Sequence, residues 1–159
     1  MSSSDLWPSV RDRLTAMMRD MRVGDPADFR TFMGAVIDQR AFDRISGYLA
    51  HARHHARVVQ GGTARGGEGY FIEPTLVEVE SPADRLMREE IFGPVLSVHA
   101  YPDDDWSGAL ALVDSTSPYA LTGAVFAQEA AAVAEAKAAL RDAAGNFYVN
   151  DKPTDRKST

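Results

Sequence analysis

The apolar residues at the start of the chain recur at the spacing of an amphipathic α-helix. The stripe consists of Leu6, Val10, Leu14, Met17 and Met21. Ser4 or Asp5 can cap this helix, and Pro8 is tolerated in its opening turn. Met17, Met18 and Met21 are expected to fill the core, because the flexible Met side chain suits irregular gaps.

A second amphipathic helix is predicted at about 38–56. Its apolar face consists of Phe42, Ile45, Tyr48, Leu49 and Ala52. His51, His54 and His55 lie about one turn apart, so His51 could share a metal ion with either of the others. A helical pair needs a third ligand and supporting hydrogen bonds, and no recognisable set lies nearby. Solvent-facing histidines and no metal site are therefore predicted.

A short strand predicted at 57–60 is followed by a glycine-rich segment at 61–69. Such a segment binds phosphate when it ends in Gly-Lys-Ser/Thr at the start of a helix. Here it leads to apolar and alternating runs at 70–72 and 75–80, which predict strands. The glycine-rich segment is therefore interpreted as a connection.

The second half of the chain alternates between predicted helices and strands. Residues 81–84 (Ser-Pro-Ala-Asp) have the cap, proline and acid of a helix start. Strands are expected at 95–101, 121–126 and 146–150, with helices from about 103 and at 129–142. Strands joined by right-handed helical crossovers pair in parallel. The predicted fold class is α/β, a three-layer, open and mostly parallel sheet with helices on both faces.

Residues 89–95, the EEIFGPV segment, join the helix that starts at 81–84 to the strand at 95–101. Two carboxylates end the helix, and Gly-Pro forces a break before the apolar run. Side chains at such a strand mouth lie where open α/β sheets bind ligands. The residues alone leave two interpretations open: a ligand site, or a solvated acidic helix end, which is the commoner case.

Composition and charge exclude several classes of function for these residues. With 159 residues, 45% of them hydrophobic and 25% charged, the chain fits one globular domain with a core. A net charge of −6 gives no basic footprint for nucleic acid or an anionic membrane. No apolar stretch of about 18 residues and no signal-peptide pattern are present, so a cytoplasmic location is expected. The absence of cysteine excludes disulfides, thiolate zinc sites and a cysteine nucleophile within these residues.

Three segments resemble the aldehyde dehydrogenase superfamily, in the order that the family shows. They are the EEIFGPV segment, residues 117–126 and residues 145–152. Four further stretches are similar to the L-glutamate γ-semialdehyde (1-pyrroline-5-carboxylate) dehydrogenase branch. They are residues 4–8, 23–26, 35–38 and 101–104. The resemblance covers about 4–154. It implies a partial catalytic domain at 1–154 and a loose, divergent tail at 155–159.

The resemblance implies NAD-dependent oxidation of a small aldehyde, L-glutamate γ-semialdehyde, to L-glutamate in proline catabolism. In the family the glutamate matching Glu90 binds the hydroxyls of the nicotinamide-side ribose, and the phenylalanine matching Phe92 packs beside the nicotinamide. A carboxylate can accept hydrogen bonds from two vicinal hydroxyls, and an aromatic face can cover a planar ring. Glu90 and Phe92 are the expected cofactor-binding residues, whereas Glu89 is expected to be a solvated carboxylate.

The resemblance also implies that much of the family's reaction centre lies outside these residues. The family's nucleophilic cysteine, general-base glutamate and NAD-binding domain precede the segment at 4–7, and its substrate-anchoring loop follows Thr154. Ser2, Ser3 and Ser4 have neither a base nor a fixed geometry to replace the thiolate, so no catalytic residue is expected. The chain alone is expected to be inactive and to bind NAD at millimolar concentration or worse, roughly above −4 kcal/mol.

Three interpretations stay open. In the first, the chain is one part of a dehydrogenase that a separate N-terminal portion completes. In the second, it is a non-catalytic interaction module or homo-oligomer that associates through apolar surface near Phe92 and at sheet edges. In the third, it is a truncated remnant without a selected activity.

Overall fold

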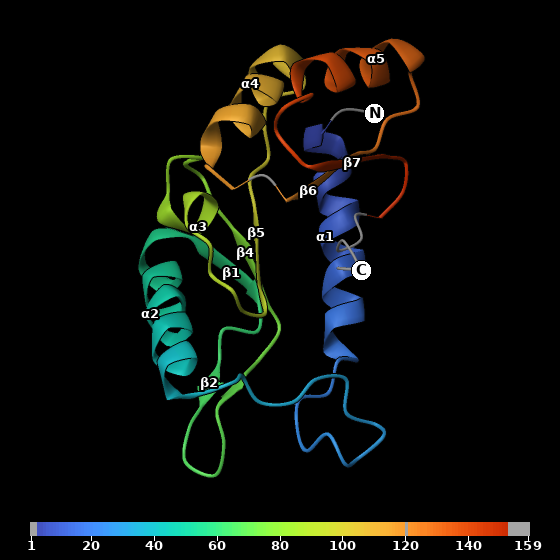
Figure 1. Cartoon of the computed structure of the whole chain (residues 1–159). Coiled ribbons are helices and arrows are strands. Elements are labelled where there is room, and N and C mark those ends of the chain that lie inside the picture. Colours follow the sequence, from blue (N-terminus) through green and yellow to red (C-terminus); the bar gives the residue numbers. More distant parts are fainter. Residues whose placement is uncertain (1–2, 120, 153–159) are drawn as a thin grey trace. The chain divides into compact units, whose positions relative to one another are not determined.

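The structure, a computed structural model, describes residues 3–119 and 121–152, with side chains from residue 6 onward (Figure 1). The chain divides into two compact units, Met1–Asp103 and Asp104–Thr159. Each unit is described by itself. Both units contain helices and strands, and part of the strand pairing is parallel, which confirms the α/β class. The predicted tail at 155–159 lies outside the described residues, and so do Ser2 and the side chains of Ser3, Ser4 and Asp5.

The first unit is built on a sheet in the order β1–β4–β5. Strand β1 (Arg57–Gln60) pairs antiparallel with β4 (Thr75–Glu78), and β4 pairs in parallel with β5 (Val95–Val98). The sheet is therefore mixed, with β4 in its centre.

The glycine-rich connection contains one strand of a small antiparallel ribbon, β2 (Ala64–Arg65) with β3 (Phe71–Ile72). At its start Gly61 has a φ of +73°, and an added Cβ would lie 2.2 Å from the carbonyl oxygen of Pro74. Only glycine fits such a position without strain. The segment thus folds back tightly on the start of β4.

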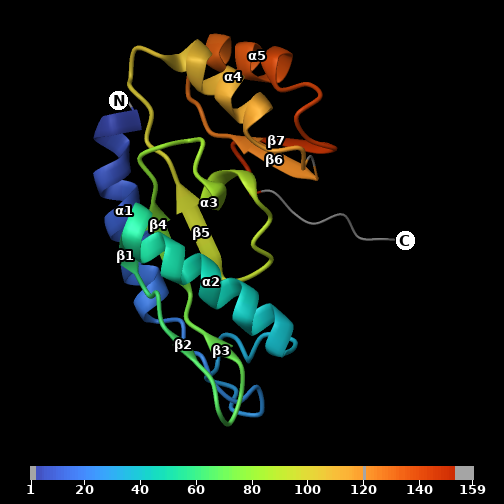
Figure 2. The same ribbon diagram turned by 90° about the vertical axis from the view of Figure 1, so that its left-hand side faces the viewer.

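Two long helices, α1 (Ser3–Arg19) and α2 (Gln39–His55), lie on opposite sides of this sheet (Figures 1 and 2). Because neighbouring residues of a strand point to opposite faces, Val77 packs in the core with α2 while Glu78 faces α1. The core of the first unit lies between α2 and the sheet. Its most deeply buried large side chains are Ile45, Leu49, Ile72, Val77 and Val79.

Helix α2 confirms its prediction. The side chain of Asp38 caps it by accepting a hydrogen bond from the Ala41 N–H at 2.7 Å. The buried residues are Ala41, Ile45, Tyr48, Leu49 and Ala52, and Phe42 packs against the same core at its edge. The 3.6-residue period identified this face because the face is covered along the helix by the sheet, by β3 and by the residues around α3.

Helix α1 departs from its prediction. Met17 is 62% exposed and Met18 and Met21 are only half-buried, so the interpretation of these methionines as core is wrong. Periodicity identifies a face suited to burial but not how much of it a partner covers, and three short strands cover only part of this helix.

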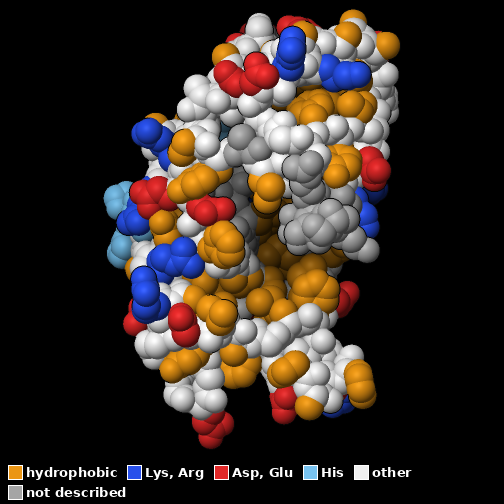
Figure 3. Space-filling view, viewed as in Figure 1, with side chains coloured by type: hydrophobic (Ala, Val, Ile, Leu, Met, Phe, Trp, Pro, Cys, Tyr) orange, Lys and Arg blue, Asp and Glu red, His pale blue; other side chains and the backbone are white. Residues whose placement is uncertain are grey.

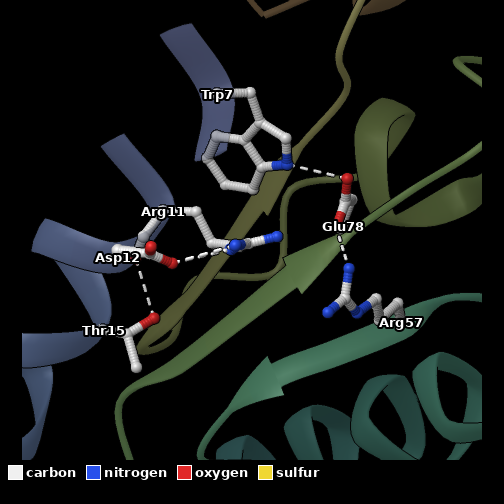
Figure 4. A network of polar contacts seen from close by, with 6 residues as sticks. All are labelled: Trp7, Arg11, Asp12, Thr15, Arg57 and Glu78. Atoms are coloured by element: carbon white, nitrogen blue, oxygen red, sulfur yellow. Dashed lines mark hydrogen bonds and ion pairs between the residues drawn. The ribbon is translucent and has the colours of Figure 1, made fainter. Parts of the chain in front are cut away.

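Polar contacts hold α1 to the sheet. The indole Nε1 of Trp7 donates to Glu78 Oε1 at 2.7 Å, and Arg57 Nη1 donates to Glu78 Oε2 at 3.2 Å (Figure 4). Both oxygens of one β4 carboxylate are therefore engaged, one by the helix and one by β1. No periodicity in the sequence predicts this arrangement.

A single helical turn, α3 (Arg85–Arg88), follows β4. The residue that caps it is Asp84, whose side chain accepts from the Leu86 N–H at 2.8 Å. The predicted cap at Ser81 is wrong: the Ser81 carbonyl accepts from the Asp84 N–H at 3.0 Å, which makes a turn before the helix. The carboxylate of Asp84 also pairs with His51 of α2, whose Nε2 lies 3.0 Å from Oδ2.

Replacing Asp84 with asparagine is expected to lower the free energy of unfolding at pH 7 by about 1 kcal/mol, because Asn still caps but loses the charged hydrogen bonds. Burial alone would raise the pKa of Asp84. The hydrogen bonds from the Leu86 N–H and from His51, together with the charges of His51 and His55, lower it by more, so the pKa lies below its usual value. A carboxyl with a depressed folded-state pKa stabilises above its unfolded pKa of about 3.9 and loses that effect as the pH falls through the folded value.

Urea unfolding at pH 7 and at low pH, with Asp20→Asn as an exposed control, tests this expectation. The difference between wild type and Asp84→Asn should shrink as the pH falls below about 4. A difference of the same size at both pH values would contradict it.

The second unit contains α4 (Trp106–Thr116), β6 (Thr122–Val125), α5 (Ala130–Ala139) and β7 (Asn146–Val149). Strands β6 and β7 pair in parallel. The small core consists of Leu110, Val125, Ala136 and Leu140. A single parallel sheet was expected from Val95 onward, but β5 pairs with β4 in the first unit, and β6 and β7 form a separate parallel pair. Alternation predicts parallel pairing but does not say which strands are neighbours.

Beyond β7, Asn150 ties the ends of the two parallel strands of the second unit together. It has a φ of +54°, and its side-chain amide forms two hydrogen bonds with the backbone of Ala127, at 2.9 and 3.0 Å. Asparagine tolerates the left-handed conformation better than most residues. The geometry at this strand end is thus set by one side chain.

Candidate functional site

The EEIFGPV segment runs from the end of α3 to the start of β5, within the first unit. It borders a pocket of about 530 Å³, which Leu86 and Met87 of α3 and Val95 and Ser97 of β5 complete. The pocket lies at the amino end of β5. The prediction of a ligand site at the mouth of this strand is therefore wrong in its reason, because open α/β sheets bind ligands at the carboxyl ends of their strands.

Side chains of the segment alternate between the core and the pocket. Ile91 is 6% exposed and belongs to the core of the first unit, whereas Phe92 is 74% exposed. Phe92 has a φ of +53°, a conformation that bulky residues rarely adopt. An exposed ring on an unusual backbone is a feature from which a functional hypothesis can start.

Gly93 lets this backbone lie directly on α2. A Cβ added to Gly93 would lie 2.5 Å from Cδ1 and 2.9 Å from Cγ1 of Ile45, which is fully buried. A side chain at 93 would therefore move the segment or distort the core. The sequence signal for this contact is the Gly-Pro pair itself, which indicates a break but not what the glycine touches.

Replacing Gly93 with alanine is expected to lower the free energy of unfolding by about 1–3 kcal/mol through this overpacking. Gly47→Ala, in the middle of α2, is the matched control. A Cβ there meets nothing within 4 Å, so it should stabilise by roughly 0.5–1 kcal/mol. Urea unfolding of both variants measures the difference. Equal stability of the two variants would show that Gly93 does not pack as described.

Glu89 is exposed, as expected, with 47% of its side chain accessible to solvent, but its carboxylate also has partners within the protein. The Tyr48 hydroxyl donates to its Oε2 at 2.6 Å, and Arg85 Nη2 donates to the same oxygen at 2.9 Å. These two hydrogen bonds, that of Tyr48 first, hold the pKa of Glu89 below its usual value. The sequence could not show this partner, because Tyr48 lies 41 residues earlier on another helix.

Glu90 differs from its neighbour. It is exposed at the edge of the pocket, and no other side chain in the described part of the chain pairs with its carboxylate. Both of its oxygens can therefore accept hydrogen bonds from a ligand. Of two adjacent glutamates, one is bound to the protein and the other is available at the pocket, beside the exposed ring of Phe92.

The histidines of α2 divide in a similar way. His54 and His55 are exposed, and histidine side chains gather at the surface over α2 (Figure 3). His51 is half-buried: it pairs with Asp84, and its ring stacks on that of His55 with centroids 4.3 Å apart. The prediction of a solvent-facing side chain is wrong for His51. Among the described residues no group of three potential metal ligands comes together.

No described helix combines the length and the apolar character that crossing a membrane requires. The pocket, the unpaired carboxylate of Glu90 and the ring of Phe92 thus form a small surface site on the first unit. Such a site can accept hydrogen bonds from hydroxyl groups and cover one flat ring. It offers no thiolate nucleophile, because the 159 residues contain no cysteine.

Comparisons with known proteins show which family this chain resembles. A family model described as "Aldehyde dehydrogenase family" matches residues 2–159. Mitochondrial delta-1-pyrroline-5-carboxylate dehydrogenases are similar: that of Danio rerio is 51% identical and that of Homo sapiens 52%, each over 152 residues. Each match covers 94% of this chain and 27% of the relative.

Among solved structures, the delta-pyrroline-5-carboxylate dehydrogenase of Mycobacterium tuberculosis bound with NAD is similar with a TM-score of 0.85 and 43% identity. The match covers 96% of this chain and 28% of that chain. A lactaldehyde dehydrogenase is similar with a TM-score of 0.86 and 30% identity, over 95% and 31% of the two chains. The chain thus spans between a quarter and a third of the proteins it matches.

Proposed function

Because the chain belongs to the aldehyde dehydrogenase family, we propose that its residues form part of the catalytic domain of an NAD-dependent dehydrogenase. The substrate proposed is L-glutamate γ-semialdehyde, which is oxidised to L-glutamate. The observation that carries the proposal is the pairing of an unengaged carboxylate, Glu90, with the exposed ring of Phe92 at one pocket. The names of the similar proteins support the substrate.

The residues present fit one end of a nicotinamide cofactor. The carboxylate of Glu90 would accept hydrogen bonds from the two vicinal hydroxyls of the ribose, and the ring of Phe92 would cover the nicotinamide. Bound NAD supplies the acceptor for the hydride that leaves the aldehyde carbon. The chain's own part is to bind and orient this half of the cofactor.

The nucleophile belongs to residues outside this chain, since aldehyde oxidation in the proposed manner needs a thiolate and the chain has no cysteine. The proposed domain extent, 1–154, therefore describes only part of a reaction centre. A second segment that carries the cysteine and the NAD-binding domain is the proposed partner.

A chimeric dehydrogenase tests the function. In it residues 4–154 of this chain replace the matching segment of the Danio rerio enzyme. The account expects NADH to form with L-glutamate γ-semialdehyde, and a Cys→Ala change of the host's nucleophile to abolish it. A folded chimera that binds NAD but does not oxidise this aldehyde would refute the substrate, and one that does not bind NAD would refute the cofactor role.

The chain alone is expected to bind NAD only at millimolar concentration or more weakly, roughly above −4 kcal/mol. Glu90 and Phe92 contact one end of the cofactor, and the contacts for its other end are not among them. Isothermal titration calorimetry with the 159-residue chain measures the affinity. Micromolar binding would show that the described residues hold more of the cofactor than we propose.

A second candidate, association with another copy of the chain, is favoured by apolar side chains at the surface of the first unit. Phe29 is 102% exposed, Ile37 is 91% exposed, and Phe92 is exposed as well. Exposed apolar side chains of this size favour association. Light scattering over a range of protein concentrations measures the oligomeric state. A chain that stays monomeric at all concentrations would count against association.

We also propose the cytoplasmic location that the sequence led us to expect. The similar eukaryotic enzymes carry mitochondrial names, which point to a different compartment. Cell fractionation followed by immunoblotting distinguishes the two locations.

A further inference from the structure

One turn of α2 holds both ends of α3. Tyr48 and His51 are three residues apart and so lie on the same face of the helix. His51 contacts Asp84, the cap at the start of α3, and Tyr48 contacts Glu89, the cap at its end. A helix of one turn is not stable by itself, so these contacts fix where it lies.

The contact at the end of α3 is a closed set of three side chains. The Tyr48 hydroxyl and Arg85 both donate to Oε2 of Glu89, and the Arg85 guanidinium lies 4.5 Å from the centroid of the Tyr48 ring. Tyr48 is itself 7% exposed and belongs to the core of the first unit. The carboxylate of Glu89 is therefore attached to a rigid part of the protein.

This attachment sets the alternation of the EEIFGPV segment. At Glu89 the backbone is extended, with φ −100° and ψ 145°, and in extended chain successive side chains point to opposite sides. Glu89 is bound toward α2, and the side chains that follow are exposed at Glu90, buried at Ile91 and exposed at Phe92. The backbone at Glu89 therefore sets the direction in which the side chain of Glu90 leaves the chain.

We propose that Tyr48 and His51 are positioning residues that act through Glu89 and Asp84 to hold Glu90 and Phe92 at the pocket. They touch no ligand themselves. The inference rests on the proposed function, because the positioned residues matter only if the pocket takes a dinucleotide. It goes beyond that function by assigning a role to Tyr48, His51, Glu89 and Arg85.

The chimeric dehydrogenase carrying Tyr48→Phe tests the role of Tyr48, because this change removes only the hydroxyl. The KM for NAD should rise by about 3- to 10-fold, the effect of one net hydrogen bond. The KM for the aldehyde and the thermal midpoint should stay near the parent values. Tyr70→Phe, in a half-buried tyrosine whose ring contacts Phe42, is the matched control.

Two further variants separate positioning from a general loss of structure. Glu89→Gln keeps an acceptor for Tyr48 and Arg85 and should stay close to the parent KM for NAD, whereas Glu89→Ala should raise it. Adding Tyr48→Phe to Glu89→Ala should have no further effect, because both changes remove the same contact. His51→Leu should raise the KM for NAD in the same direction as Tyr48→Phe.

An unchanged KM for NAD in Tyr48→Phe, or a rise that the thermal midpoint follows in proportion, would overturn the inference. Additive effects of Tyr48→Phe and Glu89→Ala would overturn it too. An inactive parent chimera that does not bind NAD would instead refute the proposed function. The two failures are thus distinguished by the parent chimera, measured before any variant.

Discussion

Glu90→Ala in the chimeric dehydrogenase is expected to raise the KM for NAD by about 10- to 150-fold. Hydrogen bonds to a charged group contribute about 1.5–3 kcal/mol, and each 1.4 kcal/mol is a factor of about ten. The ribose contact is present both before and during hydride transfer, so kcat should change much less than KM.

The control for this variant is Glu80→Ala, which removes an equally exposed glutamate that does not line the pocket. It should leave both KM and kcat at the parent values. Glu90→Gln should fall between the parent and Glu90→Ala, because one acceptor oxygen remains while the charge is lost. A KM for NAD that is unchanged in Glu90→Ala would remove Glu90 from the cofactor site.

Ile45→Ala is expected to destabilise the chain more than any other single change considered above, by about 2–5 kcal/mol. Ile45 is fully buried between α2 and the sheet. Its removal leaves a cavity directly beneath Gly93, the nearest backbone of the EEIFGPV segment. Urea unfolding of the 159-residue chain measures the loss.

The matched control is Ile37→Ala, which makes the same chemical change at a side chain that is 91% exposed. It should alter the free energy of unfolding by less than about 0.5 kcal/mol. Ile45→Val adds a second test, because it removes the Cδ1 atom that an alanine at 93 would strike at 2.5 Å. Gly93→Ala should therefore cost less in the Ile45→Val background than in the wild type, and additive costs would contradict the described contact.

The sequence predicted best those features that depend on local spacing. The limits and buried face of α2 followed from its apolar period, and the structure adds the cap at Asp38. The same period gave a wrong prediction of burial for α1, because Met17 is exposed although it continues the apolar stripe. An amphipathic pattern describes one surface, while burial requires a second surface that the pattern does not contain.

Contacts between distant parts of the chain could not be predicted. Tyr48 and Glu89 are 41 residues apart, and His51 and Asp84 are 33 apart. The predicted exposure of His51 was wrong for this reason, and the hydrogen bond from Tyr48 to the exposed Glu89 was not predicted. The pairing of β5 with β4 rather than with β6 has the same cause.

For the candidate site, the sequence identified the segment and the structure resolved its parts. The resemblance to a family pointed to Glu90 and Phe92, and both are exposed at the pocket. Only the structure shows the left-handed backbone of Phe92 and the packing of Gly93 on Ile45. These features explain why the two side chains point outward while Ile91 between them is buried.

A crystal structure of the chimeric dehydrogenase with NAD tests the central claim most directly. The account predicts that the carboxylate of Glu90 lies at hydrogen-bond distance, roughly 2.6–3.2 Å, from both hydroxyls of the nicotinamide-side ribose. It also predicts that the ring of Phe92 lies against the nicotinamide. NAD bound with Glu90 turned to solvent and the ribose held by other residues would contradict it.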